Sequence, residues 1–180
     1  MWKDAPALFK YVERCQAFLT AGSPDSDFLL YLPIYDAWSR DIGSAYMMFD
    51  IHRMDLTLPE AKASMNAIIA AGYDADYVSD ALLQEVTADR PIIVPACKYM
   101  PLETARRLLD LHKAGAKVFF IDRLPEDVPG LGCKLKARRR AFRKIARRLP
   151  EAVSLETALA ACAPESFRTE WGGSLLRRRN

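Results

Sequence analysis

The hydrophobic positions of this chain fall into short apolar runs that alternate with amphipathic segments. The clearest runs are Phe28–Leu32, Pro91–Pro95 and Lys117–Ile121. Runs this short, without an apolar–polar alternation, are typical of parallel strands that are buried on both faces. A weaker alternation across Asp74–Asp80 predicts one more strand. We therefore expect Phe28–Leu32 to form the middle of a parallel sheet.

Segments with helical spacing separate these runs. The first, Ala5–Ala21, repeats apolar residues at i, i+4, i+7 and i+11, and Asp4 is placed to cap it. A second helix opens at Thr57–Glu60, whose spacing is that of a capping box, and ends at Gly72. Further helices are expected at Ala81–Val86, Leu102–Ala114, Lys136–Leu149 and Leu155–Cys162, with another strand at Ser174–Arg177.

This alternation of strands and helices predicts a three-layer α/β/α sandwich with a mainly parallel sheet. Right-handed crossovers favour the flavodoxin-like strand order 2-1-3-4, a fold related to that of class I glutamine amidotransferases. With 180 residues and 51% hydrophobic content, we expect residues 1–180 to form one domain. No apolar run approaches the ~20 residues that cross a bilayer, and the N-terminus lacks a signal-peptide pattern.

Open α/β sheets bind ligands beyond the carboxyl ends of their strands. Aromatic and ionisable residues gather at that position after the first strand and in Ser39–Leu56, a long segment without a clear period. Such segments often carry function. The candidate residues for a substrate or interdomain contact are Tyr35, Asp36, Trp38, Asp50, His52 and Arg53.

The sequence gives little support to several common kinds of binding site. There is no P-loop motif, and Gly130-Leu131-Gly132 is too short for a dinucleotide fingerprint. The residues after the first strand, Pro33–Asp36, lack the Ser, Thr and Gly of a flavin phosphate loop. Five carboxylates stand near the predicted strand ends or in the long segment: Asp36, Asp50, Asp55, Asp80 and Asp122. A pair of acids could hydrolyse a glycoside, but most of these residues are equally well explained as caps, turn residues or ion-pair partners.

Cys97 follows the third predicted strand, where amidotransferases hold a nucleophile between glycines on a strained turn. Here its neighbours are Ala96 and Lys98. The only histidines are His52 and His112, and we expect His112 to pack on the apolar stripe of its own helix. The four cysteines, Cys15, Cys97, Cys133 and Cys162, have no metal-ligand spacing, so we predict free and mostly buried thiols.

The net charge of +3 is unevenly distributed. Nine cations and no acid lie between Lys134 and Arg148, and Arg177–Arg179 forms a second basic cluster. Phe142 and Leu149 belong to an apolar stripe that gives the first segment a face to pack. The cations are then a solvated face or a surface for an acidic partner, and nucleic-acid binding is the alternative.

An ordered series of motifs resembles the region that follows the catalytic barrel in bacterial glycoside hydrolase family 106, the α-L-rhamnosidase-like group. The resemblance covers nearly the whole chain. It rests on Phe9-x-Tyr-Val-x-Arg-Cys-x-x-x-Leu19, Tyr31-Leu-Pro-Ile-Tyr-Asp-x-Trp38, Phe49-Asp-Ile-His-Arg-Met54, Ala71–Asp80, Ile93–Ala96 and Met100–Leu102.

The resemblance implies a non-catalytic accessory domain, similar to the trimerisation domain of certain β-galactosidases. The catalytic carboxylates and a calcium site would belong to a barrel expected before Met1, so no catalytic residue, metal or cofactor is assigned to this chain. The implied partners are that barrel, carbohydrate and further copies of the chain, and neither nucleic acid nor a membrane. The implied parent is a periplasmic or secreted enzyme of complex-polysaccharide breakdown.

The chain departs from this pattern in two places. Between Leu149 and Leu155 it has only Pro-Glu-Ala-Val-Ser where relatives have a glycine-flanked strand, and it stops at Asn180 where relatives continue into β structure. We therefore expect a fragment or a shortened form. A stand-alone flavodoxin-like binder of small molecules and a basic nucleic-acid-binding protein remain the alternatives.

Overall fold

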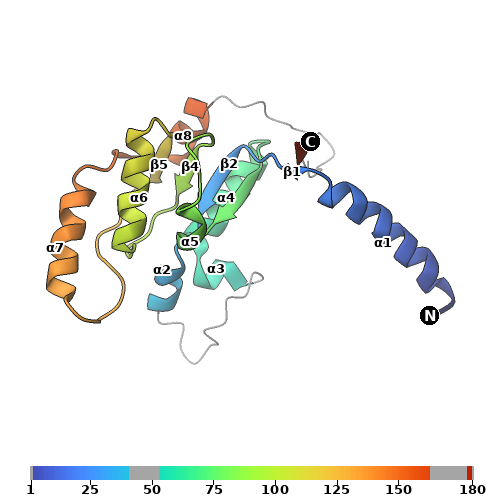
Figure 1. Cartoon of the computed structure of the whole chain (residues 1–180), viewed down its shortest axis with the longest axis horizontal. Coiled ribbons are helices and arrows are strands. Elements are labelled where there is room, and N and C mark those ends of the chain that lie inside the picture. The colour runs from blue at the N-terminus through green and yellow to red at the C-terminus, as the bar shows by residue number, and fades with distance from the viewer. Residues whose placement is uncertain (1, 41–52, 163–177, 180) are drawn as a thin grey trace.

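The computed structural model describes residues 2–40, 53–162 and 178–179 (Figure 1). The helices are η1 (Trp2–Asp4), α1 (Ala5–Thr20), α2 (Ile34–Ser39), α3 (Met54–Thr57), α4 (Pro59–Ala70), α5 (Asp80–Leu83), α6 (Leu102–Lys113), α7 (Leu135–Ala146) and α8 (Leu155–Cys162). The strands are β1 (Ser23–Pro24), β2 (Phe28–Tyr31), β3 (Ala75–Val78), β4 (Ile92–Val94), β5 (Val118–Ile121), β6 (Ala152–Val153) and β7 (Arg178–Arg179).

The central sheet has five parallel strands in the order β3-β2-β4-β5-β6. Numbered along the chain, this is 2-1-3-4-5, which confirms the predicted flavodoxin-like order and the central position of β2. The expectation that no strand stands between Leu149 and Leu155 is wrong, because Ala152 pairs with Phe120 there. The strand predicted at Ser174–Arg177 lies outside the described residues, and β7 pairs with β1 in a separate antiparallel ribbon.

The two faces of the sheet build two separate clusters, because successive side chains of a strand point to opposite faces. On one face, Leu29 and Tyr31 of β2 pack with helices α5, α6 and α7. On the other, Phe28 and Leu30 pack with α4 and α8. These helices on both faces confirm the three-layer sandwich, and all four side chains of β2 are buried.

Two of the predicted caps are wrong. Thr57 does not cap α4: it ends α3, and its hydroxyl donates to the Arg53 carbonyl, so the residue before α4 is Leu58. Asp4 precedes α1 but its side chain makes no capping hydrogen bond. The cap that forms is at α5, where the Ser79 hydroxyl accepts from the Leu82 amide.

The first helix stands apart from the sandwich. Figure 1 shows α1 extending away from the sheet, beyond the β1–β7 ribbon. No residue of α1 is buried, although its apolar stripe follows the predicted spacing. The stripe is therefore correct as a helical signal, but it does not contribute to the core of this chain.

Candidate functional site

Helix α2 begins directly after the end of β2 and carries three of the predicted site residues. The middle one, Asp36, is only 4% exposed. Its Oδ2 accepts the backbone N–H of Lys98 at 2.8 Å, and its Oδ1 accepts that of Tyr99 at 2.7 Å. Both amides belong to the loop after β4, the neighbour of β2 in the sheet. The carboxylate thus ties the ends of the two central strands together.

This contact lies at the topological switch point of the sheet. From β2 the chain crosses to β3 on one side, and from β4 it crosses to β5 on the other. In open α/β folds the crevice above such a point receives the ligand, and free backbone amides there hold its anionic group. Here the side-chain carboxylate of Asp36 takes the place of such an anionic ligand. The two amides are therefore already satisfied, and Asp36 has a structural role.

The other predicted contact residues on α2 are less buried: Tyr35 is partly buried and Trp38 is exposed. Trp38 is 54% exposed, and its ring meets that of Tyr35 edge-on, with 5.3 Å between centroids. Arg53, just before α3, is also exposed. Helices α2 and α3 lie side by side below the sheet in Figure 1 and contact each other. Asp50 and His52 lie outside the described residues.

Within the described residues, Cys97 has the surroundings of a core residue and not those of a nucleophile. It is fully buried within the cluster formed by α5, α6 and α7. Burial, followed by the negative charge of Asp36, raises the pKa of its thiol far above the usual range, which keeps it protonated. His112 is exposed on α6, so the prediction that it packs on the apolar stripe is wrong: Leu111 takes the buried position instead.

All four thiols are free, as predicted, but the prediction of mostly buried thiols is wrong. Only Cys97 is buried, Cys133 is exposed, and Cys15 and Cys162 are intermediate.

A buried polar network beside Cys97 could not be found from the sequence. The Tyr31 hydroxyl donates to Asp80 Oδ1 at 2.8 Å, and the Thr104 hydroxyl donates to the same oxygen at 2.5 Å. Burial and the adjacent Asp80 charge raise the pKa of Tyr31 beyond its ordinary value. These groups come from β2, α5 and α6, so their meeting depends on the strand order. They fix α5 and α6 against the sheet.

The remaining carboxylates at this edge also have structural partners. Glu60 of α4 forms an ion pair with Arg40, which follows α2. Partial burial raises the pKa of Glu60, but the hydrogen bond and charge of Arg40 outweigh it and lower the pKa overall. Asp55 lies 3.6 Å from Lys62 and is largely exposed. Asp122 follows β5 with φ at 62°, a left-handed conformation that Asp tolerates better than most residues.

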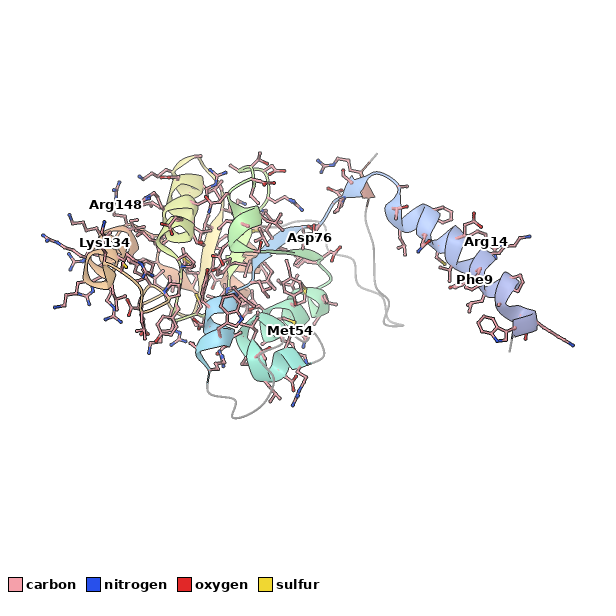
Figure 2. All side chains as sticks on the ribbon, turned by 60° about the horizontal axis from the view of Figure 1, so that its bottom comes forward. Phe9, Arg14, Met54, Asp76, Lys134 and Arg148 are labelled. Atoms are coloured by element: carbon pink, nitrogen blue, oxygen red, sulfur yellow. The ribbon has the colours of Figure 1, made fainter. Side chains whose placement is uncertain are left out.

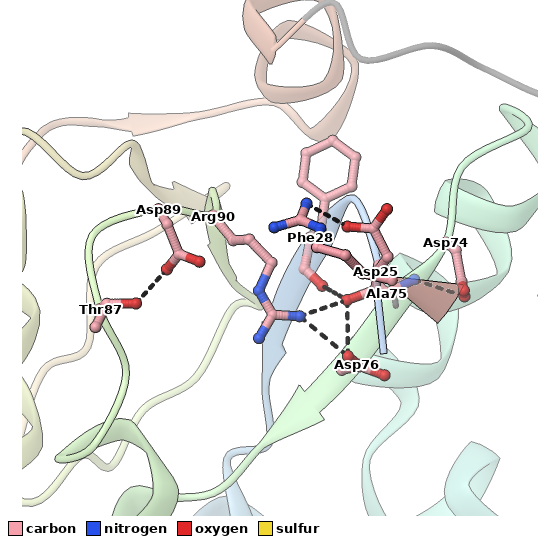
Figure 3. A network of polar contacts seen from close by, with 10 residues as sticks. Asp25, Phe28, Asp74, Ala75, Asp76, Thr87, Asp89 and Arg90 are labelled. Atoms are coloured by element: carbon pink, nitrogen blue, oxygen red, sulfur yellow. Dashed lines mark hydrogen bonds and ion pairs between the residues drawn. The ribbon is translucent and has the colours of Figure 1, made fainter. Parts of the chain in front are cut away.

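A second polar cluster lies near the β1–β7 ribbon, against the edge strand β3 (Figure 3). Arg90 donates from Nη1 to the Ser26 hydroxyl at 2.8 Å and to Asp76 Oδ2 at 3.1 Å, and Ser26 donates to the same carboxylate at 2.8 Å. Beside it runs an open groove of about 300 Å³, whose lining includes Leu82 and Asp89. The cluster joins β3 to the segments before β2 and β4.

The basic segment folds as α7 with its apolar stripe on the core, where Phe142 is buried. Two of its cations serve the domain itself. Arg139 pairs with Asp127 at 2.6 Å, and Arg138 donates to the Pro129 carbonyl. Partial burial raises the pKa of Asp127, but Arg139 outweighs it and lowers the pKa overall. The remaining cations of the segment are exposed: Lys134, Lys136, Arg140, Arg143, Lys144, Arg147 and Arg148.

The described part of the chain lacks two kinds of feature. No helix there is long and apolar enough to cross a membrane. Within the same residues, no group of three or more His, Cys, Asp or Glu side chains could hold a metal ion.

Comparison with known proteins gives a structural likeness but no sequence match. No protein-family model and no curated protein sequence match this chain. Among solved structures, it is similar to the crystal structure of β-galactosidase from Bifidobacterium adolescentis, with 20% sequence identity and a TM-score of 0.40. The match covers 70% of this chain and 55% of that chain, so it spans about half of the β-galactosidase chain. At 20% identity no residue role is carried over.

Proposed function

We propose that this chain is a non-catalytic accessory domain of an α-L-rhamnosidase-type glycoside hydrolase. In this proposal it packs on a catalytic barrel of the same parent protein and contributes to complex-polysaccharide breakdown through that contact. The sequence support is the ordered motif series that resembles family 106, together with the flavodoxin-like sheet that the resemblance implies.

The observation that carries the non-catalytic part is the position of Asp36. Its carboxylate occupies the two backbone amides at the switch point, where an open α/β sheet would otherwise bind a ligand. The cysteine at the same edge is enclosed and protonated. A domain whose crevice is closed by its own side chain is better suited to a structural role than to binding a flavin or a nucleotide.

The packing part is supported by the surface of α2 and α3. Trp38 on α2 and Leu56 on α3 are 54% and 50% exposed, Trp38 meets the ring of Tyr35, and the exposed Arg53 directly precedes α3. Aromatic residues and Arg are enriched at protein interfaces. The same groups also contact sugars, so this surface can border a sugar pocket on the barrel.

Two measurements test the proposal. The purified chain should release no more product from aryl α-L-rhamnosides than buffer does, and clear turnover would remove the non-catalytic assignment. For packing, the probe is a rhamnosidase barrel expressed without its own α/β domain, titrated with this chain by calorimetry. Trp38→Ala should weaken binding by roughly tenfold or more, whereas Leu131→Ala, at an exposed loop residue, should not. Equal effects of the two variants would contradict the assigned surface.

The basic surface of α7 favours polyanion binding as a second candidate function. Seven exposed cations lie within residues 134–148, a segment that contains no acid. A nucleic-acid binder of this kind would lose affinity steeply as salt rises, because bound counterions are released. Mobility shifts with duplex and single-stranded DNA at low salt test it. Arg143→Glu with Arg147→Glu should abolish a real shift, and the absence of any shift dismisses this candidate.

A further inference from the structure

Of the thirteen large apolar side chains exposed in the described residues, six lie on α1. Its large apolar side chains are exposed to water: Leu8 59%, Phe9 63%, Tyr11 59%, Val12 39%, Phe18 80% and Leu19 51%. Figure 2 shows Phe9 and Arg14 on this helix, away from the sandwich. A helix of this length is marginal in water by itself, and in proteins it is stabilised mainly by packing of its apolar face. The side chains therefore indicate a partner surface.

The spacing of these residues describes that partner. Leu8, Val12, Cys15 and Leu19 repeat at the alternating intervals of four and three that form the seam of a coiled coil. Phe9, Tyr11, Gln16 and Phe18 flank the seam, and the charged residues Lys10, Glu13 and Arg14 lie on the opposite side. A straight seam with its charges directed away is suited to another helix with the same pattern.

The available area is close to what a dimer needs. Aromatic side chains bury ~150–250 Å² each, so the three on the face of α1, at 59–80% exposure, offer roughly 400 Å². The leucines and the valine raise this to roughly 600–700 Å² per helix, against about 800 Å² per partner in interfaces of standard size.

We propose that α1 pairs with α1 of a second copy of this chain, in an antiparallel arrangement. Antiparallel helices align their dipoles favourably. The antiparallel direction of the two helices also follows from the position of the sandwich, which is attached at the C-terminal end of α1 (Figure 1). In a parallel pair, two sandwiches each roughly 30 Å thick would meet at one end of two helices about 10 Å apart. Antiparallel pairing places them at opposite ends.

In this arrangement, the seam residues meet in defined layers. Leu8 of one copy lies against Leu19 of the other, and Val12 lies against Cys15 of the other. The proposal is independent of the accessory-domain assignment, because it uses a different surface and needs no catalytic module.

Sedimentation equilibrium of the whole chain over a wide concentration range tests the pairing. The mass should rise from the 20.3 kDa of one chain towards twice that value. Leu8→Glu with Leu19→Glu places charges in the seam and should raise the dissociation constant by roughly two orders of magnitude or more. The control, Ala17→Glu with Thr20→Glu, adds the same charge outside the seam and should leave it within a fewfold. Circular dichroism confirms that the sandwich of each variant is folded.

Oxidative cross-linking tests the direction of the helices. In a Cys133→Ser background, which removes the exposed thiol, Val12→Cys should give a covalent dimer that peptide mapping assigns to a bond between position 12 and Cys15 of the other copy. The same background without V12C should cross-link far less. A chain that stays monomeric at every concentration, or a dimer that L8E/L19E does not weaken, overturns the pairing. Cross-links that join Cys15 to Cys15 overturn the antiparallel arrangement.

Discussion

The role assigned to Asp36 can be tested by replacing one oxygen of its carboxylate. In Asp36→Asn the amide keeps a single acceptor oxygen, so it can satisfy either the Lys98 N–H or the Tyr99 N–H, but not both. Its NH2 group would then point at the other backbone donor. The shape of the side chain barely changes, which isolates the hydrogen bonds from packing.

The expected cost follows from the burial of these groups. A hydrogen bond to a charged group contributes about 1.5–3 kcal/mol, and a buried donor left without an acceptor costs about 1–3 kcal/mol. Because Asp36 is only 4% exposed, water cannot replace the lost acceptor fully. We expect the free energy of unfolding to fall by about 2–4 kcal/mol, which for a domain of this size lowers the melting temperature by roughly 6–12 °C.

Urea denaturation followed by circular dichroism measures this difference, and the m-value should stay constant. Amide hydrogen exchange at Lys98 and Tyr99 should accelerate in the variant. The control is Asp55→Asn, whose side chain is 59% exposed and whose ion pair with Lys62 spans 3.6 Å. Its effect should remain within about 0.5 kcal/mol.

The reasoning would be refuted if Asp36→Asn were as stable as the wild type and if hydrogen exchange at the Lys98 and Tyr99 amides were unchanged. It would mean that water already satisfies these groups and that the crevice at the switch point is open. The structural role of Asp36 would then be lost, and with it the main support for a non-catalytic domain.

Three further predictions concern single side chains. Asp127→Asn should lower the free energy of unfolding by up to about 1 kcal/mol at neutral pH, because the folded-state pKa of this carboxyl is lowered. In urea denaturation at a series of pH values, the stability difference from the wild type should shrink as pH falls below the ordinary Asp pKa of about 3.9. It should vanish below the folded-state pKa. Iodoacetamide at mildly alkaline pH should modify Cys133 first and Cys97 only after unfolding, as peptide mass spectrometry would show, since burial raises the pKa of Cys97. Tyr31→Phe should cost about 1–2 kcal/mol in thermal melts by removing a hydrogen bond of a buried hydroxyl, whereas Tyr11→Phe, on α1 and outside the sandwich, should change little.

Local pattern was sufficient for four of the five strands of the sheet, and it missed the two-residue strand β6. Phe28–Leu32 and Lys117–Ile121 are short apolar runs bounded by turn residues, and their strands appear within a residue of the prediction. Right-handed crossovers then leave few strand orders, so the flavodoxin-like arrangement could be predicted as well. These features depend on the chemistry of neighbouring residues, which a sequence displays directly.

Contacts between distant residues could not be predicted in this way. Asp36 was a candidate contact residue by its place after a strand, yet its partners lie 62 and 63 residues further on, and only the pairing of β2 with β4 brings them together. The Thr57 capping pattern failed because its hydroxyl is used in the preceding helix, α3. For α1, the sequence determined an apolar stripe, but only the tertiary structure could decide that it is not buried. An apolar stripe indicates that a helix packs against some partner surface. Whether that surface lies in the same chain depends on the tertiary structure.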